Sequence, residues 1–257
     1  MATAILLYAF GMGLYYQLLF VYALELGASR FDIGVLTAVL LASTAASSLP
    51  GAWAADRFRL RPVIAVVWWL TAPAALFYLF APTWEWLIPG LALTGVSMAN
   101  NPAMKAYVYL RSDDGHVARN ATLVYGSFPV GLIVSPLLGG YLADLHGMRV
   151  VFALSAAFYV ASAVAATLLS DLSDHTTEAP WSMADAYRNR RFRRYVAFFL
   201  LGFLAVYVGQ AFLTPYLAQV HDQGYGALGV YASLAAVMSA IRPRHPLRAR
   251  WCKFGHT

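Results

Sequence analysis

The sequence is poor in charge and contains a single cysteine, Cys252. Only 12% of its 257 residues are charged, which is about half of the share that soluble domains carry. With so little charge a water-exposed surface could hardly be covered, which excludes an ordinary soluble domain. One cysteine excludes an internal disulfide framework. Hydrophobic residues, in contrast, make up 60% of the chain.

The charged residues lie in short clusters and leave eight uncharged runs, each 19 to 26 residues long. The runs are Ala4–Leu24, Ile33–Ala55, Pro62–Trp84, Trp86–Met104, Asn120–Ala143, Val150–Ser170, Tyr195–Val220 and Gln223–Ile241. About 20 apolar residues in a helix cross the roughly 30 Å hydrocarbon core of a bilayer. Since open sheets cannot span lipid, the sequence predicts an all-α, polytopic membrane protein with about eight transmembrane helices.

Basic residues are distributed unevenly between the two sides that these runs define. With the N-terminus inside, sixteen of the 18 Lys and Arg residues fall in cytoplasmic segments, and only Arg30 and Arg149 fall outside. This bias predicts a multi-pass protein of the cell (plasma or inner) membrane with both termini in the cytoplasm. The net charge of +6 is therefore interpreted as a topology signal, and no nucleic-acid partner is expected.

Two loops of the chain resemble each other. Residues 50–65 align without a gap with residues 138–153, so that Asp56 pairs with Asp144 and Arg61 with Arg149. One loop joins the second and third runs and the other joins the fifth and sixth, so they lie on opposite sides of the membrane. This offset predicts two three-helix units related by a pseudo-two-fold axis in the membrane plane, which is typical of secondary transporters.

At these residues the chain resembles the major facilitator superfamily. The family's hallmark between its second and third helices is Gly-x-Leu-Ala-Asp-Arg-x-Gly-Arg-Arg. This chain matches it at Asp56, Arg57 and Arg61, and has Ala52 and Arg59 at the two glycine positions. The resemblance implies a six-helix bundle built from two inverted three-helix repeats, followed by part of a second bundle.

The resemblance also implies gating roles for both loops. In the family the inside loop latches onto a helix of the second half and favours the outward-open state. The candidate gating residues are Asp56, Arg57, Arg61, Asp144 and Arg149. The alternative is that these charges serve only insertion topology.

The fifth run carries a glycine- and proline-rich pattern that looks like the signature of the family's antiporters. Its residues are Gly131, Pro136, Gly139 and Gly140. The pattern favours export of small organic compounds, and close helix packing is the alternative interpretation.

The resemblance divides the chain into four parts. Residues 1–170 form a six-helix transporter half, and 171–194 a cytoplasmic linker. Residues 195–241 begin a second half with helices seven and eight, and 242–257 form a basic tail that we expect to be disordered. Because members of the family normally carry twelve helices, we expect a C-terminally truncated carrier. Self-association could replace the missing half, or the product could be inert.

Polar residues within the runs are the candidates for contact with a solute, because such groups tend to face cavities or partners. In the family the first helix of each three-helix unit lines the central cavity, which selects the first, fourth and seventh runs here. These supply Tyr15, Tyr16, Gln17, Asn100, Asn101, Tyr207 and Gln210, and the fifth run adds Tyr125. Interhelical hydrogen bonding is the alternative role for all of them.

The runs contain no Asp, Glu, Lys or Arg, and the histidines lie in loops or tails. Without a buried carboxylate pair, a Ser–His pair or a metal cluster, we expect no enzyme, no cofactor and no metal site. We expect a secondary transporter that moves a small organic solute by alternating access, with a leaning to efflux or antiport. The alternative is a transport-inactive membrane protein or assembly partner derived from such a transporter.

Overall fold

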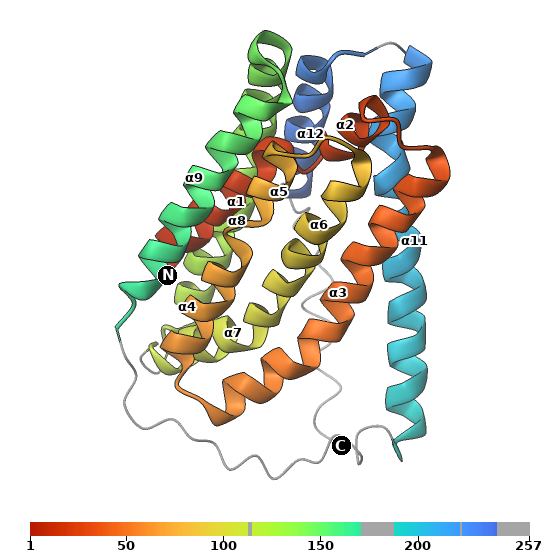
Figure 1. Ribbon diagram of the computed structural model, residues 1–257. Coiled ribbons are helices and arrows are strands. Elements are labelled where there is room, and N and C mark those ends of the chain that lie inside the picture. Colours follow the sequence, from red (N-terminus) through yellow and green to blue (C-terminus); the bar gives the residue numbers. More distant parts are fainter. Residues whose placement is uncertain (113–114, 171–187, 222, 241–257) are drawn as a thin grey trace.

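The computed structural model describes residues 1–112, 115–170, 188–221 and 223–240, and the regular elements in these ranges are helices (Figure 1). Most of the predicted linker at 171–194 and all of the predicted tail at 242–257 lie outside the described residues. The predicted class, an all-helical membrane protein, is confirmed. Five helical segments are long and apolar enough to cross a bilayer: Ala2–Glu25, Arg30–Arg57, Leu60–Leu79, Val117–His146 and Met148–Thr167.

The eight predicted runs all fall on helices, and five of them correspond to a single helix each. These are α3 (Arg30–Arg57), α8 (Val117–His146), α9 (Met148–Thr167), α11 (Arg190–His221) and α12 (Tyr225–Ala240). The other three runs are interrupted. The first consists of α1 (Ala2–Tyr15) and α2 (Leu19–Glu25), and the third of α4 (Leu60–Thr71) and α5 (Ala74–Leu79). The fourth consists of η1 (Trp84–Trp86), α6 (Leu87–Val96), η2 (Ser97–Ala99) and α7 (Asn100–Leu110).

Local sequence explains several of these boundaries. Ser29 and Asp32 form a capping box that starts α3. Pro73 immediately precedes α5, and Pro102 follows η2 by three residues. Proline has no N–H to donate to the preceding turn, so an uninterrupted helix is disfavoured at both places. Gly147 has φ +80°, a conformation that glycine adopts without a steric cost, and it separates α8 from α9.

The core lies where α1 packs between α8 and α9. An aromatic cluster fills this region: Tyr15, Tyr22, Tyr78, Phe152 and Tyr159. Within the cluster the hydroxyls of Tyr15 and Tyr159 form a hydrogen bond of 2.8 Å. Around this centre α3 packs on α6 and α7, α12 packs on α8, and α11 contacts α2 and α3. The last two helices therefore pack on three of the earlier ones, α2, α3 and α8.

The two related loops lie at opposite ends of the bundle (Figure 1). Arg61, near the start of α4, donates through Nη2 to the carbonyl oxygen of Thr167 at 2.7 Å, so the end of α9 lies beside the Asp56 loop. The 20 residues of α9 rise about 30 Å, which places its beginning, and Asp144 just before it, at the far end. This is the placement that an inverted pair of three-helix repeats requires.

Candidate functional site

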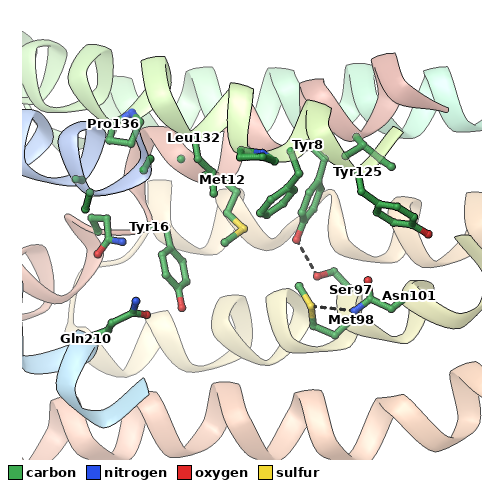
Figure 2. Close-up of a pocket in the computed structure, with 18 of the residues that line it drawn as sticks. Tyr8, Met12, Tyr16, Ser97, Met98, Asn101, Tyr125, Leu132, Pro136 and Gln210 are labelled. Atoms are coloured by element: carbon green, nitrogen blue, oxygen red, sulfur yellow. Dashed lines mark hydrogen bonds between the residues drawn. The ribbon is translucent and has the colours of Figure 1, made fainter. Parts of the chain in front are cut away.

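A cavity of about 580 Å³ lies within the bundle (Figure 2). Its walls come from α1, the interruption after α1, η2 and α7, α8, α11 and α12, with Trp68 added by α4. A volume of this size is within the range of pockets that hold small organic ligands.

Two interrupted helices supply the cavity wall at their interruptions. Tyr16 and Gln17 lie between α1 and α2, and Ser97 and Met98 lie in η2. These two spans are the first helices of the two three-helix units, but the interruptions lie at different places in the repeat, because the alignment that pairs Asp56 with Asp144 pairs Tyr16 with Met104 inside α7. Discontinuous helices at a repeat interface are typical of the substrate sites of secondary transporters.

Polar groups in the cavity occur at two levels. Tyr8 and Ser97 share a hydrogen bond of 2.8 Å between their hydroxyls, and the Asn101 amide nitrogen lies 3.5 Å from the sulfur of Met98. Figure 2 shows Tyr16 and Gln210 toward the other end of the cavity. Because Tyr8 and Tyr16 are eight residues apart along one chain segment, the two levels are separated by about 12 Å.

One hydroxyl in the wall is left without a protein partner. The Tyr125 oxygen is buried and has no hydrogen bond within the part of the chain that the structure describes. A buried polar atom without a partner costs free energy, and a bound molecule can supply that partner. Tyr125 is therefore a potential donor or acceptor for an occupant of the cavity.

Five of the predicted contact residues line the cavity: Tyr16, Gln17, Asn101, Tyr125 and Gln210. The side chain of Tyr207 lies outside the described residues.

Tyr15 and Asn100 do not line the cavity, so the prediction that places them on its wall is corrected. Both are 0% exposed. The hydroxyl of Tyr15 shares a hydrogen bond with the hydroxyl of Tyr159 in the aromatic core. The Asn100 amide nitrogen donates to the carbonyl of Ile64 at 3.2 Å. One residue along a helix is a rotation of about 100°, so the immediate neighbours of Tyr16 and Asn101 face a different direction.

The prediction missed several lining residues because they are apolar or aromatic: Tyr8, Met12, Trp68, Met98, Met104 and Phe128. A signal for part of this set is present in the sequence. Ile5, Tyr8, Met12 and Tyr16 recur at spacings of three and four, and such residues lie on one face of a helix. Of this stripe only Tyr16 carries a hydroxyl near the expected midplane, so the prediction includes Tyr16 alone.

None of the candidate gating residues Asp56, Arg57 and Arg61 has a hydrogen bond, ion pair or ring contact with α11 or α12 within the described residues. Asp56 is exposed and has no hydrogen bond or ion pair within the described chain. The Arg57 guanidinium lies 6.0 Å from the ring centre of Trp53 on the same helix. Arg61 donates to Thr167, as described above. The latch onto the second half that the family resemblance implies is thus not formed here by these residues.

The Asp144 loop, in contrast, contacts α12. Asp144 accepts a hydrogen bond of 2.8 Å from the backbone N–H of Gly226, the second residue of α12. The first N–H groups of a helix have no partner within it, and a negative charge is favourable at this end. Arg149, the other predicted gating residue of this loop, is exposed.

The glycine- and proline-rich residues of α8 bring two different helices close. On one face Gly131 and Gly139 lie against α1, where an added Cβ at Gly139 would meet the backbone of Leu14. On another face Gly140 lies against the backbone of Tyr225, and the Pro136 carbonyl lies against Gly229. At these positions α8 therefore packs closely against both α1 and α12.

The cavity is closed toward the Asp144 end. Several hydrogen bonds between the first six spans and the last two lie on that side: Asp144–Gly226, Arg30–Gln219 at 3.4 Å and Leu137–Ser233 at 3.1 Å. On α11, Ala211 and Thr214 are buried, whereas every described side chain from Arg190 to Gln210 is exposed. Among the described side chains of α11, buried ones therefore occur only after Gln210, the α11 residue that lines the cavity.

Comparison with known proteins adds a sequence relationship and a fold. A sequence profile described as the Major Facilitator Superfamily matches residues 1–251. No curated protein sequence matches the chain. Solved structures with a similar fold include a bacterial homologue of the human lysosomal transporter Spinster in an inward-facing, occupied conformation, with 20% identity and a TM-score of 0.66.

Two further structures resemble the chain at 14% identity. They are the nucleoside transporter NupG, with a TM-score of 0.69, and the human organic anion transporter MFSD10 (TETRAN), with a TM-score of 0.64. The matches cover 93% of this chain, but 57% of the Spinster homologue, 65% of NupG and 68% of MFSD10. At these identities the likeness establishes the fold alone.

Proposed function

The chain belongs to the major facilitator superfamily, and we propose that it is a secondary transporter that moves a small organic solute by alternating access. The observation that carries the proposal is the 580 Å³ cavity between the first six spans and α11 and α12. The similarity in fold to solved transporter structures, together with the apolar helices long enough to span a membrane, supports a multi-pass transporter rather than an enzyme.

The closure at one end of the cavity supports the alternating part of the proposal. A carrier that alternates must close one end while the other is accessible, and here the closing contacts gather at the Asp144 end. If the basic residues orient the chain as proposed, with both termini in the cytoplasm, this end faces outward. The described conformation then corresponds to an inward-facing state in the cell membrane.

The two related loops act as opposite latches in this proposal. The contact of Asp144 with the start of α12 holds the outer end closed. The Asp56 loop occupies the equivalent place at the cytoplasmic end, and it engages the second half in the outward-facing state. This explains why Asp56 has no partner in the described conformation while its counterpart has one.

We propose export as the direction of transport. The support is the resemblance of α8 to the family's antiporters at Gly131, Pro136, Gly139 and Gly140. The names of NupG and MFSD10 specify a nucleoside and an organic anion, both small organic solutes, which supports that general class of cargo for this chain.

Alternating access can be tested without knowing the cargo. In a Cys252→Ser background, Gln17→Cys places one thiol in the cavity wall. A membrane-impermeant thiol reagent is applied to the purified chain in oriented liposomes, first from the Asp56 side and then from the Asp144 side. We expect fast labelling from the Asp56 side and slower, measurable labelling from the other side.

The control for this experiment is Leu154→Cys, which lies on the exposed face of α9 away from the cavity and should label from neither side in lipid. Labelling of Gln17→Cys from one side only, even after long exposure, would contradict alternating access. Cross-linking of the same samples reports whether the labelled species is a monomer or a self-assembled carrier.

A further inference from the structure

The cavity wall contains no charged side chain in the part of the chain that the structure describes. None of the eight apolar runs contains Asp, Glu, Lys or Arg either. A charged solute that enters such a space loses hydration and finds no opposite charge to replace it. The wall therefore disfavours organic anions and organic cations alike.

The apolar part of the wall is suited to a flat ring. It presents the aromatic side chains of Tyr16, Tyr125 and Phe128 together with the thioethers of Met12, Met98 and Met104. Aromatic rings stack on other rings, and methionine sulfur makes favourable contacts with ring edges. Thioether side chains are also flexible, so they adapt to the outline of a planar ligand.

The polar part of the wall is suited to hydrogen-bonding groups at both ends of a ligand. Gln17 and Gln210 supply amides at the closed end, since both also line the narrow space of about 10 Å³ beyond the main cavity. Asn101 and the partnerless hydroxyl of Tyr125 supply groups at the other level. An amide both donates and accepts, so it pairs with neutral amides, ring N–H groups and hydroxyls.

We propose that the cargo is an uncharged, planar aromatic or heteroaromatic solute with a hydrogen-bonding group at each end. The assignment rests on the proposed transporter function and specifies the solute class of the same cavity. Gln210 and Gln17 bind the leading polar group, the aromatic and methionine side chains hold the ring, and Asn101 and Tyr125 bind the trailing group.

Three probes of similar size separate charge from shape. Indole-3-acetamide is neutral and carries an N–H at one end and an amide at the other. Indole-3-acetate is the matching anion and tryptamine a matching cation. Binding of each tritiated probe to the purified full chain in detergent is measured by equilibrium dialysis, which requires no transport.

We expect the neutral amide to bind at least tenfold more tightly than either ion. A smaller ratio, or no measurable binding of the amide, overturns the assignment. Tighter binding of tryptamine would identify an aromatic cation site, and tighter binding of indole-3-acetate would identify an anion site. Either result leaves the transporter proposal intact, because alternating access is measured separately by thiol labelling.

A charge introduced into the wall provides the second test. Gln210→Glu places a carboxylate at the closed end of the cavity, and we expect the ratio of amide to tryptamine affinity to fall at least tenfold. Gln223→Glu makes the same change in the turn between α11 and α12, outside the cavity, and should leave the ratio unchanged. An unchanged ratio in Gln210→Glu, or an equal change in both variants, overturns the placement of the ligand.

Discussion

The contact between Asp144 and α12 provides the sharpest test of the closure at the Asp144 end of the cavity. Asp144→Ala removes the oxygen that accepts from the Gly226 N–H and the negative charge beside the helix N-terminus. Loss of a capping acceptor costs about 0.5–2 kcal/mol, and loss of a charge at an exposed helix start about 0.3–1 kcal/mol. Since Asp144 is exposed to solvent, we expect a total near the lower limits, about 1 kcal/mol.

A loss of about 1 kcal/mol from the closed state shifts the equilibrium between closed and open outer ends by about fivefold. The assay is the rate at which the Gln17→Cys thiol reacts with an impermeant reagent applied from the Asp144 side. Asp144→Ala should raise this rate about fivefold by the same arithmetic. Asp144→Asn keeps an accepting oxygen and loses only the charge, so its rate should rise less.

The matched control is Glu85→Gln, which removes an exposed carboxylate in η1 at the same end of the bundle. It corrects for any general effect of negative charge on the reagent. If the labelling rate of Asp144→Ala stays within twofold of the Glu85→Gln rate, the Asp144 carboxylate does not hold this end of the cavity closed. The latch argument from the inverted repeat then fails with it.

Three further outcomes are expected from the same geometry. Gly139→Ala places a Cβ against the α1 backbone and should lower the thermal unfolding midpoint by the equivalent of about 1–3 kcal/mol. Gly126→Ala, which has open space around it, should be neutral or stabilising. Equal midpoints for the two variants would contradict the close approach of α1 and α8. Arg61→Gln loses a charge-assisted hydrogen bond to a backbone carbonyl and should destabilise the chain by about 1–2 kcal/mol in the same measurement. Arg149 is exposed, so Arg149→Gln should change the midpoint little. A larger loss for Arg149→Gln than for Arg61→Gln would refute a structural role for Arg61. Asn101→Cys should react with an impermeant thiol reagent several-fold faster from the Asp56 side than from the Asp144 side, and equal rates would be inconsistent with a cavity closed at one end.

The parts of the fold that physics fixes locally could be predicted from the sequence. The thickness of the bilayer determines the length of an apolar run, so the runs locate the helices. The paired Asp and Arg spacing predicts that the two loops lie at opposite ends, and the contact of Arg61 with the end of α9 agrees with this. Glycines on α8 predict close helix approach, and the contacts of Gly131 and Gly139 with α1 show it.

The site was harder to predict because it depends on rotation about helix axes. Asn100 and Asn101 are equivalent in a residue count, but only the second reaches the cavity, since the first is turned toward Ile64. The interruption after Tyr15 carries no proline that would mark it in the sequence. Which of the two loops contacts α11 or α12 depends on the conformational state, and the same sequence is compatible with more than one state.

Helix α8 packs against α1 with one face and against α12 with another, so substitutions on the two faces should have different effects. A side chain at Gly139 would disturb the contact between α8 and α1, so we expect such a mutant to fold poorly and to be degraded during membrane insertion. A side chain at Gly140 would disturb the contact between α8 and α12, so that mutant should reach the membrane intact but favour a different conformational state. A genetic screen that scores abundance and activity separately would therefore sort neighbouring glycines of one motif into two phenotypes.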